Sequence, residues 1–112
     1  MIFERDEYSV SYTPGSDVAT LSGVMRLATP AAYERVFIAL ATRIGTGEPL
    51  AVDLTKLTFM NSSGIRALAM LVLAAKERGT ALRLVANGAV PWQKKTASSL
   101  AAVSRDLAVE LR

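Results

Sequence analysis

The sequence contains neither cysteine nor histidine. Without cysteine the chain has no disulfide, no thiol nucleophile and no thiolate ligand for a metal ion. Without histidine it has no imidazole base, no serine–histidine catalytic triad and no His-ligated zinc. Most hydrolase and metalloenzyme chemistries are therefore excluded, and we expect a protein that is not an enzyme and that holds no metal and no cofactor.

Long apolar runs are also missing. The longest one spans residues 67–75, whereas a membrane-spanning helix needs about 20 apolar residues. Charged residues follow Met1, Ile2 and Phe3 at once, so the start does not resemble a secretory signal, which has an apolar run there. We therefore expect a cytoplasmic protein that does not contact a membrane.

Charge of one sign is not concentrated in any stretch. The 13 Lys and Arg residues exceed the 10 Asp and Glu residues by a formal charge of +3, and Lys94 and Lys95 are the only adjacent pair of cations. Nucleic-acid-binding domains usually gather their cations on one face or along one stripe. We therefore expect no DNA or RNA partner.

The 112 residues are 51% hydrophobic and 21% charged, which is the size and composition of one globular domain. We expect a single domain over residues 1–112. Apolar periodicity, capping residues and glycine or proline signals divide the chain into elements. The predicted strands are residues 8–12, 18–25, 50–54 and 82–86, and residues 107–111 are either a last strand or a helical tail.

The predicted helices begin at Pro30, at residue 61 and at Pro91, and the first two end at Gly45 and Gly79. Residues 13–17 are predicted to be the turn of an N-terminal hairpin, and residues 55–60 are predicted to be a loop. Strands that alternate with helices require crossover connections. The sequence therefore predicts an α/β fold, with a mixed sheet of four to five strands, an N-terminal hairpin and at least three helices.

Polar residues open the second helix: Asn61, Ser62 and Ser63, followed by Gly64. Asn and Ser are ordinary N-cap residues, so these side chains could serve as caps only. The start of a helix also favours an anion, because its backbone N–H groups are unpaired and its dipole is positive there. A phosphate on Ser62 could be tolerated at this position, and so could a phosphate-bearing ligand.

The helix that follows is apolar nearly all round, with no charge between Arg66 and Lys76. It is therefore either buried on two sides or it exposes a patch that a partner covers. Asp53, near the end of the third predicted strand, could accept backbone N–H bonds around Asn61 or act as a catalytic acid. Because no second carboxylate or base lies near it in sequence, we favour the supporting role.

Residues 53–65 resemble the signature of the STAS domain family of bacterial anti-sigma factor antagonists, with Asn61 where that family usually has Asp. The resemblance implies a non-enzymatic signal-transduction protein that regulates transcription. It also implies a serine kinase that is at the same time an anti-sigma factor as the partner, and a cognate phosphatase. The phosphorylated residue would be Ser62, or its neighbour Ser63.

Docking would involve the 61–64 segment and the exposed part of the helix after it. The expected partner-binding residues are Asn61, Ser62, Ser63, Gly64, Ile65, Arg66 and Met70. Two other functions fit the same pattern: a constitutive protein–protein adaptor whose serines are only caps, and a small-ligand or nucleotide sensor that uses the helix start as an anion site. The sequence makes no prediction of the oligomeric state.

Overall fold

The computed structural model describes residues 2–4, 8–12, 17–26 and 33–112. Six strands in this part of the chain form one sheet in the order β1-β2-β3-β4-β5-β6. They are β1 (Ile2–Glu4), β2 (Tyr8–Tyr12), β3 (Val18–Met25), β4 (Leu50–Met60), β5 (Leu82–Ala86) and β6 (Ala108–Leu111). β1, β2 and β3 are antiparallel neighbours, whereas β3 to β6 run parallel.

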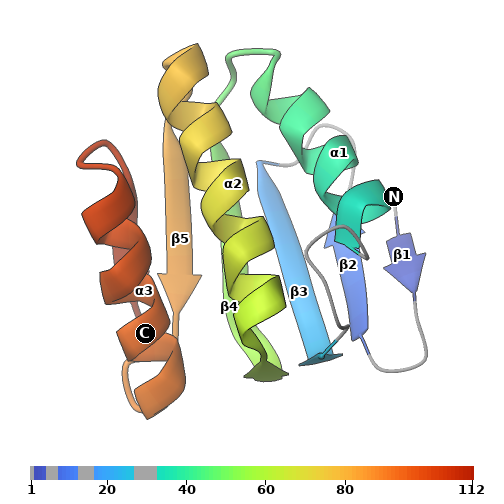
Figure 1. Ribbon diagram of the computed structural model, residues 1–112, viewed down its shortest axis with the longest axis vertical. Helices are drawn as coiled ribbons and strands as arrows, with labels where there is room; N and C mark the ends of the chain where they lie inside the picture. The colour runs from blue at the N-terminus through green and yellow to red at the C-terminus, as the bar shows by residue number, and fades with distance from the viewer. Residues whose placement is uncertain (1, 5–7, 13–16, 27–32) are drawn as a thin grey trace.

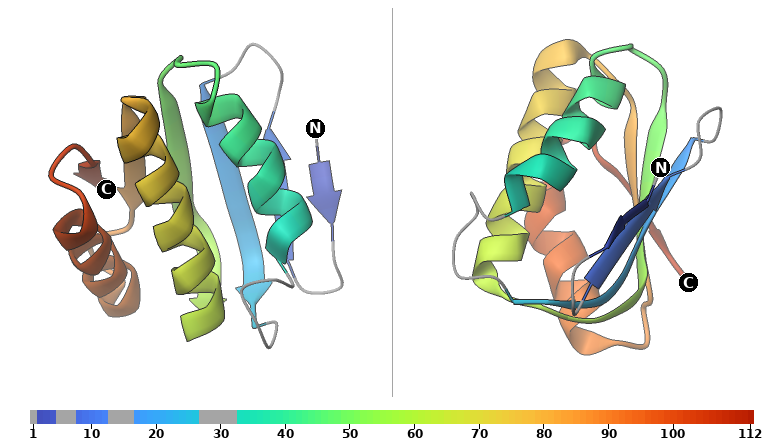
Figure 2. Two further views of the ribbon diagram at one scale, coloured as in Figure 1. Left: turned by 45° about the horizontal axis from the view of Figure 1, so that its top comes forward. Right: turned by 90° about the vertical axis from the view of Figure 1, so that its right-hand side faces the viewer.

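Three helices, α1 (Glu34–Ile44), α2 (Ser62–Arg78) and α3 (Pro91–Val103), connect the parallel strands. All three lie on one face of the sheet, as the right-hand view of Figure 2 shows. α2 lies between α1 and α3 (Figure 1), and it packs against both of them. The first turns of α2 and α3 lie at the end of the sheet where the parallel strands finish.

The hydrophobic core fills the space between the sheet and these helices. Alternate residues of β2 and β3 contribute to it, as expected for strands with one buried face. The Tyr33 ring, which is fully buried, lies 5.5 Å from the Tyr8 ring and 6.4 Å from the Phe37 ring. These aromatic contacts join α1 to the antiparallel edge of the sheet.

The connection from α1 to β4 is held by Arg43, whose side chain is 12% exposed. Its Nε donates to the Tyr12 hydroxyl at 2.6 Å, and its two terminal nitrogens donate to the carbonyls of Glu48 at 2.9 Å and Pro49 at 3.0 Å. A guanidinium can make these bonds at once because its donors are fixed in one plane. Arg43 therefore ties the loop before β4 to β2.

Residues 55–60 were predicted to be a loop, and this prediction is wrong because β4 continues to Met60. Two register shifts against β3 explain the error. Thr20 and Ser22 pair with Asp53 and Lys56, so β4 carries one extra residue at that point. A second extra residue of β4, Thr58, lies between the residues that pair with Gly23 and Val24.

The two bulges replace the usual period of two by a period of three. Leu54, Leu57 and Met60 are all buried, although they are three residues apart. A regular strand would place such residues alternately on its two faces. Each bulge adds one residue to β4, so a side chain three positions further along points to the same face again. The residues from 55 onward therefore do not show the alternation by which a strand is recognised in a sequence.

The other predicted elements that fall on described residues agree with the structure. The mixed sheet, the N-terminal hairpin and three helices are confirmed, and residues 107–111 form mainly a strand, β6. β1 is an additional strand, and it pairs with β2 at the antiparallel edge. The predicted helix start at Pro30 and residues 13–16 of the predicted turn lie outside the described residues.

Candidate functional site

The candidate site lies where β4 ends and α2 begins. Asn61 has an extended backbone, with φ −80° and ψ 176°, and its side-chain oxygen accepts a hydrogen bond from the Gly64 N–H at 3.0 Å. Its own backbone N–H donates to the Met25 carbonyl at the end of β3, at 2.9 Å. Asn61 is therefore the N-cap of α2, and it also fixes the start of this helix to the neighbouring strand.

Gly64 lies in the first turn of α2, directly against the end of β4. A Cβ atom added at this position would lie 2.8 Å from Cγ of Met60. Met60 is buried, with 5% of its surface exposed, so it has little room to move. A glycine avoids this contact, because the helix start and the strand end approach each other so closely.

We expect Gly64→Ala to destabilise the protein by about 1 kcal/mol. Alanine favours a helix over glycine by about 1 kcal/mol, but overpacking of a buried site costs about 1–3 kcal/mol. The free energy of unfolding in urea measures the net effect. In a Met60→Ala background the same substitution should be neutral or stabilising, and stabilisation by Gly64→Ala in the wild-type protein would contradict the close approach.

The structure separates the two candidate phosphorylation residues. Ser62 is the first residue of α2 and is exposed, whereas Ser63 is buried, with 9% of its surface exposed. A kinase must reach the hydroxyl of its substrate and surround it with its own active site. In this folded state Ser62 is the accessible residue, and Ser63 faces inward.

The outer side of α2 carries exposed residues at helical spacing, and we call them the outer stripe. Its members are Ser62, Arg66, Met70, Leu73 and Glu77. Met70 and Leu73 are 64% and 43% exposed, although both are apolar. α2 is therefore flanked by α1 and α3 and also exposes apolar residues on its outer stripe. That a partner covers this patch stays a prediction.

The predicted partner-binding residues divide between the surface and the interior. Ser62, Arg66 and Met70 are exposed on the outer stripe. Asn61 is half-buried, and Ser63 and Gly64 are buried. Ile65 is also half-buried, and it packs against the core.

Asp53 accepts a backbone N–H, as predicted, but the donor is Thr55 and not a residue around Asn61. Its Oδ1 accepts from the Thr55 N–H at 2.8 Å and from the Thr55 hydroxyl at 2.7 Å. Thr55 is one of the residues of the first bulge in β4, where the regular ladder to β3 is interrupted. Asp53 therefore stabilises this bulge, and the expectation that it supports the segment around Asn61 directly is wrong.

Gln93 supports the same strand from α3, a role that was not predicted from the sequence. Its side chain is almost fully buried. Its Nε2 donates to the Leu57 carbonyl at 3.0 Å, next to the second bulge, and its Oε1 accepts from the Asn87 N–H at 2.8 Å. Gln93 therefore satisfies two backbone groups and holds the last part of β4 against the start of α3.

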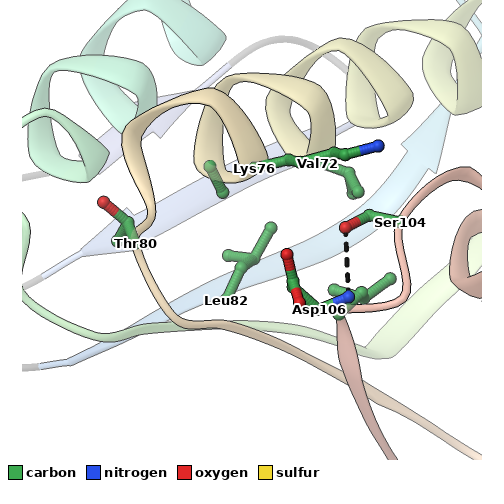
Figure 3. A pocket seen from close by; sticks show the side chains of 8 residues that line it. Val72, Lys76, Thr80, Leu82, Ser104 and Asp106 are labelled. Carbon is green, nitrogen blue, oxygen red and sulfur yellow. Dashed lines mark hydrogen bonds between the residues drawn. The ribbon is translucent and has the colours of Figure 1, made fainter.

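A small cavity lies between the ends of α2 and α3 (Figure 3). It is lined by Val72, Ala75, Lys76, Thr80, Leu82, Ser104, Asp106 and Leu107. Its volume of about 10 Å³ is enough for about one water molecule. Among the described residues, no group of three or more acidic, histidine or cysteine side chains is placed to hold a metal ion.

The family model described as "Mlab, STAS domain" matches residues 9–105. The chain therefore belongs to the STAS domain family, whose members are generally regulatory domains of the anti-sigma factor antagonist type rather than enzymes. A comparison with curated proteins gave no match. No helix in the part of the chain that the structure describes is long and apolar enough to cross a membrane.

Proposed function

We propose that this protein is a cytoplasmic, non-catalytic switch that binds a serine kinase of the anti-sigma factor type and is released when Ser62 is phosphorylated. The observation that carries the proposal is the position of Ser62. It is exposed at the first position of α2 and it shares the outer stripe with the exposed apolar residues Met70 and Leu73. A partner that covers the stripe would therefore also cover Ser62.

Phosphorylation would change this surface without unfolding the domain. A phosphoserine carries about −1.5 to −2 charges at pH 7, and a helix N-terminus tolerates such a charge. Arg66 follows Ser62 by one helical turn on the same side of α2, so a phosphate on Ser62 could pair with its guanidinium. The phosphate would then oppose docking through its charge and through the cost of removing its hydration. A cognate phosphatase would restore the binding form.

A constitutive adaptor is the second candidate, and the exposed apolar residues of the outer stripe favour it. Met70 and Leu73 are exposed while Ser62 carries no phosphate, so the surface that an adaptor would use is already open. The cap of α2 is Asn61, which accepts from the Gly64 N–H, so the serines of such an adaptor need not be caps. An adaptor would use the same outer stripe, and its affinity for the partner would not change with phosphorylation.

Incubation with the kinase-type partner and ATP separates these two functions. The switch predicts a mass increase of one phosphoryl group per chain, located on Ser62 by peptide mapping. It also predicts that Ser62→Ala abolishes this increase while Ser63→Ala, which removes a buried hydroxyl, leaves the acceptor in place. An unchanged mass, with the partner still bound, would support the adaptor.

A further inference from the structure

The chemical character of the side chains in the outer stripe changes along α2. Between Ser62 at its start and Glu77 at its end, the cation Arg66 comes first, and the apolar side chains of Met70 and Leu73 follow it at positions i+4 and i+7. Residues with this spacing lie on one side of a helix. At a rise of about 1.5 Å per residue, Arg66 and Leu73 are about 10 Å apart along the axis, which is two turns. Over residues 66–73 a partner therefore meets a positive charge at one end and an apolar surface at the other, and Glu77 follows one turn later.

The positive end is not neutralised by carboxylates in the part of the chain that the structure describes. The first turns of α2 and α3 contain no acidic residue, and no described carboxylate forms an ion pair with Arg66. Lys94 and Lys95 are exposed near the start of α3, which lies at the same end of the sheet (Figure 1). Because the dipoles of α2 and α3 are also positive at these ends, the complementary partner surface is acidic.

The apolar end favours a protein over a nucleic acid as the partner. Met70 and Leu73 are exposed on α2, and Ile38, which is 55% exposed, lies on the neighbouring helix α1. Exposed apolar side chains that are neighbours on one helix, as Met70 and Leu73 are, are typical of a surface that another protein covers. A phosphate backbone would supply anions for Arg66, but it would offer nothing apolar to Met70.

We propose that the partner docks through an acidic amphipathic helix that lies along the outer stripe of α2. Its carboxylates lie opposite Arg66, and its apolar side chains pack on Met70 and Leu73. This inference rests on the proposed function and deepens it, because it states the chemistry of the partner. A phosphate on Ser62 would then both engage Arg66 and repel the carboxylates of the docking helix.

A photo-crosslinking amino acid, benzoylphenylalanine, placed at position 70 tests this inference. Met70 is largely exposed, so the replacement should not disturb the fold. The variant is crosslinked in its complex with the kinase-type partner, and the attached peptide is sequenced. We expect an acidic segment with apolar residues at i, i+4 and i+7. A neutral or basic segment, a nucleic acid, a lipid, or no crosslink at all would overturn the inference.

Charge reversal on the protein then tests the role of Arg66. A synthetic peptide of the crosslinked segment should bind Arg66→Glu at least 10-fold more weakly than the wild-type protein. The matched control is Arg105→Glu, an exposed cation before β6 at the opposite end of the sheet, which should change binding by less than twofold. A peptide whose carboxylates are replaced by amides should no longer distinguish Arg66→Glu from the wild type. Equal effects of the two charge reversals would contradict the inference.

The outcomes also separate this inference from the phosphorylation switch. If Ser62→Asp binds the peptide normally while Arg66→Glu does not, the docking helix is correct and the switch is wrong. If Ser62→Asp loses the partner but the crosslinked segment is not acidic, the switch is correct and the docking helix is wrong.

Discussion

Ser62→Asp is expected to weaken binding of the kinase-type partner by about 100-fold, which corresponds to about 2.7 kcal/mol. The new carboxylate would lie on the outer stripe of α2, where a docked partner removes water from it. Like charges that face each other across an interface cost several kcal/mol. The fold should be unaffected or slightly stabilised, because an acidic side chain in the first turn of a helix interacts favourably with its dipole. Isothermal titration measures the affinity, and urea unfolding measures the stability.

Two matched variants control for this substitution. Ser62→Ala removes the hydroxyl without adding charge and should bind the partner as the wild type does. Ser98→Asp makes the same chemical change at an exposed position of α3, outside the outer stripe, and should also leave binding intact. If Ser98→Asp weakened binding as much as Ser62→Asp, the effect would come from net charge and not from the site.

Gln93→Leu is expected to lower the free energy of unfolding by about 3 kcal/mol. Leucine fits the apolar surroundings of α3, but it can neither donate to the Leu57 carbonyl nor accept from the Asn87 N–H. A buried polar group that loses its partner costs about 1–3 kcal/mol, and this substitution leaves two such groups. Urea unfolding followed by the fluorescence of Trp92, the neighbouring residue, measures the change.

The exposed neighbour Lys94 provides the control for Gln93. Lys94→Leu introduces the same side chain one residue later in α3, and it should change stability by no more than about 0.5 kcal/mol. Gln93→Glu should be at least as destabilising as Gln93→Leu, because its carboxylate would lie against the Leu57 carbonyl oxygen. A loss below 1 kcal/mol for Gln93→Leu would mean that the bond to Leu57 contributes little to the fold.

The sequence predicts this fold well wherever the elements are regular. Strands with alternating apolar residues and helices with clear end signals can be placed correctly, because these patterns are local. β4 is the exception, since its two bulges are visible only in its register against β3 and not in the apolar pattern of its own residues. The buried residues Leu54, Leu57 and Met60 are spaced three apart, a spacing that is not typical of a strand.

The candidate site could be predicted only in part, because some of its signals are local in the sequence and others depend on packing. Asn61 is a strong local N-cap signal, and the structure places it in that role. The difference between Ser62 and Ser63 depends on how α2 is rotated over the sheet, which is decided by packing. Gln93 could not be found because the carbonyl to which it donates is 36 residues away in the chain. Leu73 was missed because one apolar residue among many in this helix does not reveal which side is open.

The most direct test of the phosphorylation switch compares two fractions of the protein isolated from its native cells. One fraction co-purifies with the kinase-type partner and the other is free, and the peptide that contains Ser62 is mapped in both by mass spectrometry. We predict that the free fraction carries a phosphate on Ser62 and that the bound fraction does not. Equal phosphorylation of the two fractions, or no phosphate in either while the partner stays bound, would contradict the switch.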